Sequence, residues 1–268
     1  MSTKIQYTDE PLDDLRVVRD FLLPPESLSH GAAMNPGSRV IVALDFESAD
    51  QAAQLVEQLG ASASFYKVGL QLLTAEGPSV VRQLVADGKQ VFLDLKLLEI
   101  PNSVAGAVTA AGKLGVSMIT VHASGGSAVL RAAVAAARPF PLLKVLALTV
   151  ITSMRDKDLL EVGVSAPVQE QVLRLARLAL AAGCHGVVAS PWEPQVLREI
   201  LPRDMLIVTP GTQLSSDAKN DQARTATPGD AIRAGSPHLV IGRSISRSPD
   251  PAASFAAICA QVAEAAPR

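Results

Sequence analysis

The chain has 268 residues, of which 48% are hydrophobic and 19% charged, and its formal net charge is −2. This composition excludes a disordered chain, and the length suffices for one large buried core. Aromatic residues make up 3% and no basic block is present, so nothing here supports nucleic-acid binding. No apolar run is long enough to span a membrane. The two cysteines form no disulfide framework, which suits a cytoplasmic protein.

Residues 1–38 differ from the rest of the chain. Between Leu12 and Leu23 apolar residues recur at helical spacing, acidic residues precede them, and two prolines follow. This pattern predicts one amphipathic helix, either packed on the main fold or held loosely as an arm. A secretory signal would need a basic start followed by an apolar run, and neither is present. We therefore expect an N-terminal extension over 1–38 and a single catalytic domain over 39–268.

From residue 39 onward, eight apolar runs alternate with amphipathic stretches. The runs, rich in Val, Ile and Leu, are Val40–Leu44, Phe65–Val68, Val91–Leu95, Met118–Val121, Leu143–Val150, Gly186–Ala189, Leu206–Val208 and Leu239–Ile241. Helical patterns between them include Asp50–Leu59, Val80–Ala86, Val104–Leu114, Ala128–Ala136, Pro167–Ala182 and Pro194–Ile200. Apolar strands alternating with helices indicate a parallel sheet covered on its outer face. Eight such units predict an α/β fold of the (β/α)8 TIM-barrel type.

Nearly every apolar run ends in a polar residue. These residues are Asp45, Lys67, Asp94 with Lys96, His122, Thr152 with Ser153, Ser190, Thr209, and Arg243 after Gly242. In a barrel the C-terminal ends of all strands meet at one mouth, where catalytic residues lie. An open doubly wound sheet would concentrate such residues at one switch point, so polar groups at eight ends favour the closed barrel. His122 is expected to be a hydrogen-bonded core histidine without a catalytic role.

Asp94 and Lys96 stand two apart on the third run, so both side chains are expected on the same side of that strand. A lone charge inside a barrel is costly. The pair is therefore either a functional Asp–Lys pair at the mouth or a buried ion pair that holds the barrel together. Lys67 ends the neighbouring strand, and Glu99 follows Lys96 closely. The order Lys67, Asp94, Lys96, Glu99 alternates in sign, which predicts an array that keeps each lysine protonated.

The segment Asp94–Val104 reads Asp-Leu-Lys-Leu-Leu-Glu-Ile-Pro-Asn-Ser-Val. It resembles the Asp-x-Lys-x-x-Asp-Ile-Pro-Asn-Thr-Val signature of the orotidine 5′-phosphate decarboxylase family. Further segments that match the family in order are Val42–Asp45, Lys67–Gly69, Leu148–Met154, Thr209–Gly211, Asp221-Gln222 and Val240–Arg243. The resemblance extends from about residue 39 to 265 and leaves out the N-terminal extension. Several segments in the right order are far more specific than a single Asp-x-Lys.

Three positions depart from the family pattern. Glu99 stands where family members usually carry Asp, which lengthens that arm by one methylene. Gln213 stands where many bacterial members carry Arg, so one cation on the phosphate side is missing. Leu97-Leu98 replaces a commoner Phe-His pair.

The resemblance implies decarboxylation of orotidine 5′-monophosphate to UMP and CO2 in pyrimidine biosynthesis, with no metal or organic cofactor. It implies that Lys96 stabilises the carbanion at C6 and donates a proton to it, with Asp94 beside the departing carboxylate and Lys67 orienting Asp94. The implied substrate-binding residues are Asp45 and Lys67 at the ribose, Thr152 and Ser153 at the pyrimidine, Gln222 between phosphate and base, and Pro210, Gly242 and Arg243 on the phosphate side. Family members are homodimers, so Glu99, Ile100 and Ser103 are expected to complete the partner's site.

Two alternatives stay open. A magnesium-dependent keto-sugar-phosphate decarboxylase or hexulose-phosphate synthase of the same superfamily would share the Asp-x-Lys core. The segment Ile100–Asn102 and the Thr152-Ser153 pair favour the nucleotide enzyme, and no Cys/His cluster has metal-ligand spacing. The other alternative is a non-catalytic nucleotide-binding barrel, which Glu99 in place of Asp would suit.

Overall fold

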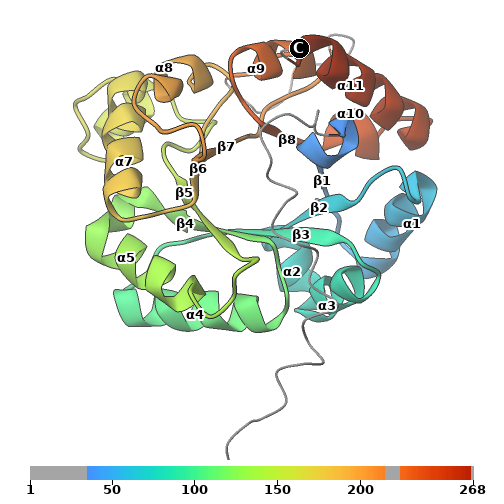
Figure 1. Ribbon diagram of the computed structural model, residues 1–268, viewed down its shortest axis with the longest axis horizontal. Helices are drawn as coiled ribbons and strands as arrows, with labels where there is room; N and C mark the ends of the chain where they lie inside the picture. Colours follow the sequence, from blue (N-terminus) through green and yellow to red (C-terminus); the bar gives the residue numbers. More distant parts are fainter. Residues whose placement is uncertain (1–34, 215–223, 267–268) are drawn as a thin grey trace, which may run out of the picture. The chain divides into compact units, whose positions relative to one another are not determined.

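Eight parallel strands form a closed barrel in the part of the chain that the structure, a computed structural model, describes, namely residues 35–214 and 224–266 (Figure 1). The strands are β1 (Val40–Ala43), β2 (Phe65–Gly69), β3 (Gln90–Leu97), β4 (Met118–His122), β5 (Lys144–Leu148), β6 (Gly186–Val188), β7 (Leu206–Thr209) and β8 (His238–Ile241). Each strand pairs with the next in sequence, and β8 pairs with β1. The predicted (β/α)8 TIM barrel is therefore confirmed. The helix expected between Leu12 and Leu23 lies outside the described residues.

Helices surround the barrel and connect its strands (Figure 1). They are α1 (Ala49–Leu59), α2 (Leu70–Glu76), α3 (Ser79–Ala86), α4 (Pro101–Lys113), α5 (Gly126–Ala137), α6 (Asp156–Glu161), α7 (Val168–Ala181), α8 (Pro194–Arg198), α9 (Pro228–Arg233), α10 (Arg243–Ser246) and α11 (Pro251–Ala265), with the 3-10 helices η2 (Pro36–Arg39) and η3 (Ala123–Gly125). The six helical patterns read from the sequence each correspond to one of these. Helices such as α6 and α10 are too short to show a periodic pattern.

The strands place alternate side chains in two separate apolar layers. Ile41 and Ala43 of β1 belong to a cluster that fills the barrel, whereas Val40 and Val42 pack against the helices. The other members of the inner cluster are Phe65, Phe92, Met118, Leu146, Leu148, Val188, Val208 and Val240. Strand geometry turns every second residue to the same side. Asp45, Lys67, Asp94 and Thr120 each follow an inner residue by two, so the inward series becomes polar at the C-terminal ends.

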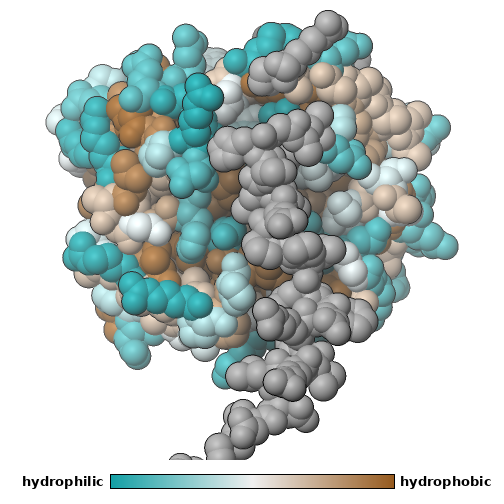
Figure 2. Space-filling view, viewed as in Figure 1, coloured by the Kyte–Doolittle hydropathy of each residue, from teal (hydrophilic) through white to brown (hydrophobic). Residues whose placement is uncertain are grey.

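Hydrophilic and hydrophobic residues are interspersed over the face of the molecule in Figure 2. Large exposed apolar residues include Leu70, Leu98 and Ile100, which are 58–62% exposed and lie close after β2 or β3. Among the described helices, none combines the length and the apolar character needed to cross a bilayer.

Candidate active site

The C-terminal ends of the strands surround a cavity of about 730 Å³. Its lining includes many of the residues predicted to bind substrate or act in catalysis: Asp45, Lys67, Asp94, Lys96, Thr152, Ser153, Pro210, Gly242 and Arg243. These residues come from β2 and β3 and from the segments after β1, β5, β7 and β8. The mouth predicted from polar strand ends is thus a real cavity that brings together residues up to two hundred positions apart.

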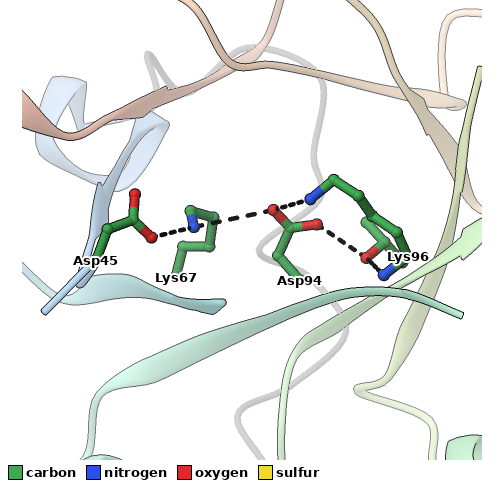
Figure 3. A network of polar contacts seen from close by, with 5 residues as sticks. Asp45, Lys67, Asp94 and Lys96 are labelled. Carbon is green, nitrogen blue, oxygen red and sulfur yellow. Dashed lines mark hydrogen bonds and ion pairs between the residues drawn. The ribbon is translucent and has the colours of Figure 1, made fainter. Parts of the chain in front are cut away.

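Four charged side chains of alternating sign lie in a row across the first three strands (Figure 3). The Lys67 ammonium donates to Asp45 Oδ1 at 2.7 Å and lies 3.9 Å from Asp94 Oδ2. The Lys96 ammonium donates to the same Asp94 Oδ2 at 2.7 Å. The side chain of Asp94 is 12% exposed and that of Lys96 is 34% exposed. An ammonium held by a buried carboxylate, yet open to a cavity, can stabilise negative charge that develops on a ligand.

The array differs in composition from the expected one. The sequence predicts Lys67, Asp94, Lys96 and Glu99, but in the folded chain Asp45 joins the row, and Glu99 does not. Glu99 Oε1 accepts a hydrogen bond from the backbone N–H of Ile100 at 2.7 Å, outside the cavity lining. Ile100 is 62% exposed and Ser103 is exposed on α4, and neither lines the cavity. Within one chain, these three predicted site residues are not brought to the site. Gln222 lies outside the described residues.

The backbone at Lys96 departs from regular strand geometry. Leu93 pairs with Ile119 and Leu97 with Val121, so four steps along β3 match two along β4. Lys96 has φ of 51° and is the one non-glycine residue of the described chain with positive φ. The prediction that simple alternation carries Asp94 and Lys96 to the same side was incomplete. A bulge intervenes, and the two side chains meet because the backbone is locally bent.

Thr120 of β4, which is not among the site residues predicted from the sequence, contacts both residues of the Asp–Lys pair. Its hydroxyl donates to Asp94 Oδ1 at 2.9 Å and accepts from the backbone N–H of Lys96 at 2.8 Å. Asp94 thus uses one carboxylate oxygen for the lysines and the other for Thr120. The available signal was a threonine at an inward position of the otherwise apolar run Met118–Val121, two residues after Met118.

Three of the predicted polar strand ends, His122, Ser190 and Thr209, lie outside the cavity lining. Thr209 is fully buried and its hydroxyl accepts from Ser236 at 2.6 Å, so the expectation that it faces the common mouth was wrong. It follows Ile207 on the side that packs against the helices. His122 Nδ1 lies 2.6 Å from Ser124 Oγ. Burial lowers the pKa of His122, and the nearby charge of Lys96 lowers it further.

A buried ion pair joins segments that follow different strands. Glu193, after β6, pairs with Arg224, after β7, and an Arg224 N–H also donates to the carbonyl of Ile151, after β5, at 3.3 Å. Burial raises the pKa of Glu193, and the charge of Arg224 opposes that rise. The pair connects three loops of the mouth, next to Thr152 and Ser153. Sequence reasoning missed it because the two residues are far apart in the chain and belong to no periodic pattern.

The chain is similar in sequence and fold to proteins of known family. Residues 38–258 match the family model described as "Orotidine 5'-phosphate decarboxylase / HUMPS family". An orotidine 5′-phosphate decarboxylase of Idiomarina loihiensis is 46% identical over 229 residues, covering 84% of this chain and 98% of the relative. One of Moorella thermoacetica is 45% identical over 239 residues, covering 85% and 94%. The crystal structure of the Lactobacillus acidophilus enzyme of that name superposes with a TM-score of 0.74 at 38% identity, covering 83% and 98%.

These matches span the whole barrel and most of each relative's length. No group of three or more potential metal-ligating residues, of the kind His, Cys, Asp or Glu, occurs within the described ranges. The chain belongs to the orotidine 5′-phosphate decarboxylase family.

Proposed function

We propose that this protein decarboxylates orotidine 5′-monophosphate to UMP and CO2, the step that forms UMP in pyrimidine biosynthesis. The observation that carries the proposal is the contact of 2.7 Å between Lys96 and the buried Asp94, in the cavity that Arg243 also lines. Relatives named for this activity, 45–46% identical over most of the chain, support the same reaction.

The reaction breaks the bond between C6 and its carboxylate and leaves the electron pair on C6. That pair lies in the plane of the ring, so the ring carbonyls cannot delocalise it as they would an enolate. Fixed charge must stabilise it instead. The Lys96 ammonium supplies this charge and then donates a proton from Nζ to C6, after which solvent reprotonates the amine. Asp94 holds the ammonium in place, and Lys67 bridges Asp94 and Asp45.

Substrate binding uses groups that do not react. Arg243 suits the phosphate because its planar guanidinium can donate two hydrogen bonds, and loops after strands seven and eight of such barrels commonly bind phosphate. Pro210 and Gly242 line the same side, Asp45 and Lys67 would contact the ribose, and Thr152 and Ser153 the pyrimidine. Gln222, by resemblance, would connect phosphate and base. The free energy gained by binding the phosphate can hold the pyrimidine of the substrate against the row of charged side chains.

No metal or organic cofactor enters this mechanism, which separates it from the magnesium-dependent sugar-phosphate enzymes of the same superfamily. We expect the purified protein to consume orotidine 5′-monophosphate at the same rate with and without an excess of EDTA. The change in ultraviolet absorbance as the substrate becomes UMP measures the rate.

A chelator that abolishes turnover, with recovery on addition of Mg²⁺, would favour the magnesium-dependent alternative. Binding of UMP without any turnover would favour a non-catalytic nucleotide-binding barrel. Either result contradicts the proposal.

We further propose that the protein acts in the cytoplasm as a homodimer with shared active sites, that residues 39–268 are its catalytic domain, and that residues 1–38 are an N-terminal extension. The exposure of Leu98 and Ile100, at 58% and 62%, supports an interface beside β3. Glu99, Ile100 and Ser103 stand outside the cavity of their own chain. In a two-fold dimer, each chain would offer this segment to the other's site. Glu99 would then add the carboxylate missing from the row.

Subunit complementation tests the shared site. We expect the variants Lys96→Ala and Glu99→Ala to be impaired separately and to recover activity when co-expressed. A mixed dimer would contain one site with both Lys96 and the partner's Glu99 intact. With random pairing about one quarter of all sites are intact, so activity should approach about one quarter of wild type.

The matched control is co-expression of Lys96→Ala with Asp94→Asn. Both residues belong to the same chain's cavity, so every site in the mixed dimer is defective and activity should stay at the level of the single variants. Equal behaviour of the two mixtures would refute the shared site.

A further inference from the structure

The strongest unassigned feature is the hydroxyl of Thr120, at the bulge between β3 and β4. Its side chain belongs to the inward series of β4, and the residue has no solvent exposure. A buried hydroxyl is costly unless it is hydrogen-bonded. Here it donates one bond, to Asp94 Oδ1 at 2.9 Å, and accepts one, from the Lys96 backbone at 2.8 Å.

The bulge explains why the acceptor is needed. Between Leu93 and Leu97 the register of β3 against β4 shifts, so residues in between lose their regular ladder partners. The positive φ of Lys96 is a conformation that side-chain-bearing residues rarely adopt. Such a conformation persists only where the surroundings determine it. The Thr120 hydroxyl satisfies the Lys96 N–H and so stabilises this backbone conformation.

The donated bond fixes the other member of the pair. Asp94 Oδ2 receives the Lys96 ammonium at 2.7 Å and lies 3.9 Å from that of Lys67, while Oδ1 receives Thr120. Rotation of the carboxylate would break the bond to Thr120 and move the acceptor of both lysines. One hydroxyl therefore fixes the backbone of Lys96 and the carboxylate that holds its ammonium.

We propose that Thr120 is a positioning residue for the decarboxylation: its hydroxyl sets the place of the Lys96 ammonium relative to the substrate. The proposal rests on the proposed function, because it assigns Lys96 the reacting ammonium. A small displacement of a reacting group lowers the rate of the reaction far more than it weakens ligand binding. The expected signature is a fall in kcat with little change in KM.

The test compares Thr120→Val, Thr120→Ser and Thr209→Val. Valine keeps the shape of threonine but can neither donate nor accept, so we expect kcat to fall about 10- to 100-fold while KM and the UMP Kd change less than about threefold. Serine keeps both bonds, and its kcat should stay within about threefold of wild type. Thr209 is equally buried and hydrogen-bonded, to Ser236, but faces the helices. Its valine variant should lose stability and keep kcat.

Several results would overturn the inference. Wild-type kcat in Thr120→Val would show that the hydroxyl does not position Lys96, and so would an equal fall in Thr120→Ser or in Thr209→Val. If Thr120→Val does not fold, Thr120→Cys takes its place, because a thiol is a weak donor and acceptor of similar size. Its kcat should fall at least about fivefold, and an unchanged value contradicts the proposal. A wild-type protein without decarboxylase activity would instead refute the proposed function.

Discussion

Replacing Lys96 by alanine should lower kcat by about 10⁴-fold or more while UMP still binds. This variant loses two contributions to the rate. General acid catalysis contributes about 10²- to 10⁴-fold, and one preorganised charge at the reacting atom contributes about 10²- to 10³-fold. UMP carries no carboxylate at C6, and under the proposed function it binds through its phosphate, ribose and base. Its Kd, measured by calorimetry, should therefore change little.

Two comparisons make this result specific. Lys113→Ala removes an exposed lysine at the C-terminal end of α4, away from the strand ends that form the mouth, and should leave kcat unchanged. The pKa of His122, followed by NMR, should rise in Lys96→Ala, because the charge of Lys96 lowers it in the wild-type protein. High residual activity in Lys96→Ala would refute the assignment of Lys96 as the proton donor. An unchanged pKa of His122 would show that the ammonium is not close to it.

The barrel could be predicted from the sequence because the same hydrophobic pattern occurs eight times. Eight apolar runs separated by amphipathic stretches leave few alternatives once parallel strands must be covered by helices. The alternation of side chains then fixes which residues point inward, so Ile41, Ala43 and Asp45 form one series. By the same rule, the side chain of Lys67 points inward like that of Phe65, and the side chain of Asp94 points inward like that of Phe92. The part of the cavity lining that the strands contribute, such as Lys67 and Asp94, follows from this alternation and from the direction of the strands, whereas most of the lining lies on the segments after the strands.

The features of the site that the sequence did not predict depend on contacts between residues that follow no periodic pattern. The bulge at Lys96 inserts residues into β3 that no hydrophobic pattern marks, and the role of Thr120 exists only once that bulge forms. Glu193 and Arg224 meet because loops after different strands converge. Under the proposed function, Glu99 enters the cavity of a second chain. The fold of one chain therefore does not bring Glu99 to its own cavity.

Under the proposed function Arg243 binds the phosphate of the substrate, and the neutral side chain of Gln213 leaves that binding more dependent on Arg243. Gln213 lines the same cavity but carries no charge. The phosphate of the substrate is close to a dianion at neutral pH. We therefore expect Arg243→Ala to lower kcat/KM for orotidine 5′-monophosphate by about 10²- to 10³-fold, since breaking a close charge pair costs about 2–5 kcal/mol.

A substrate without the phosphate shows whether Arg243 acts through it. With the nucleoside orotidine, wild type and Arg243→Ala should have the same low kcat/KM, because this substrate has no phosphate for the arginine to bind. The exposed Arg174, which pairs with Glu170 on α7, gives the control: Arg174→Ala should leave both substrates unaffected. An equal loss with both substrates in Arg243→Ala would mean that the arginine supports the fold or the pyrimidine site. A loss confined to the phosphorylated substrate means that the remote phosphate, held by Arg243, contributes binding energy to the step at C6.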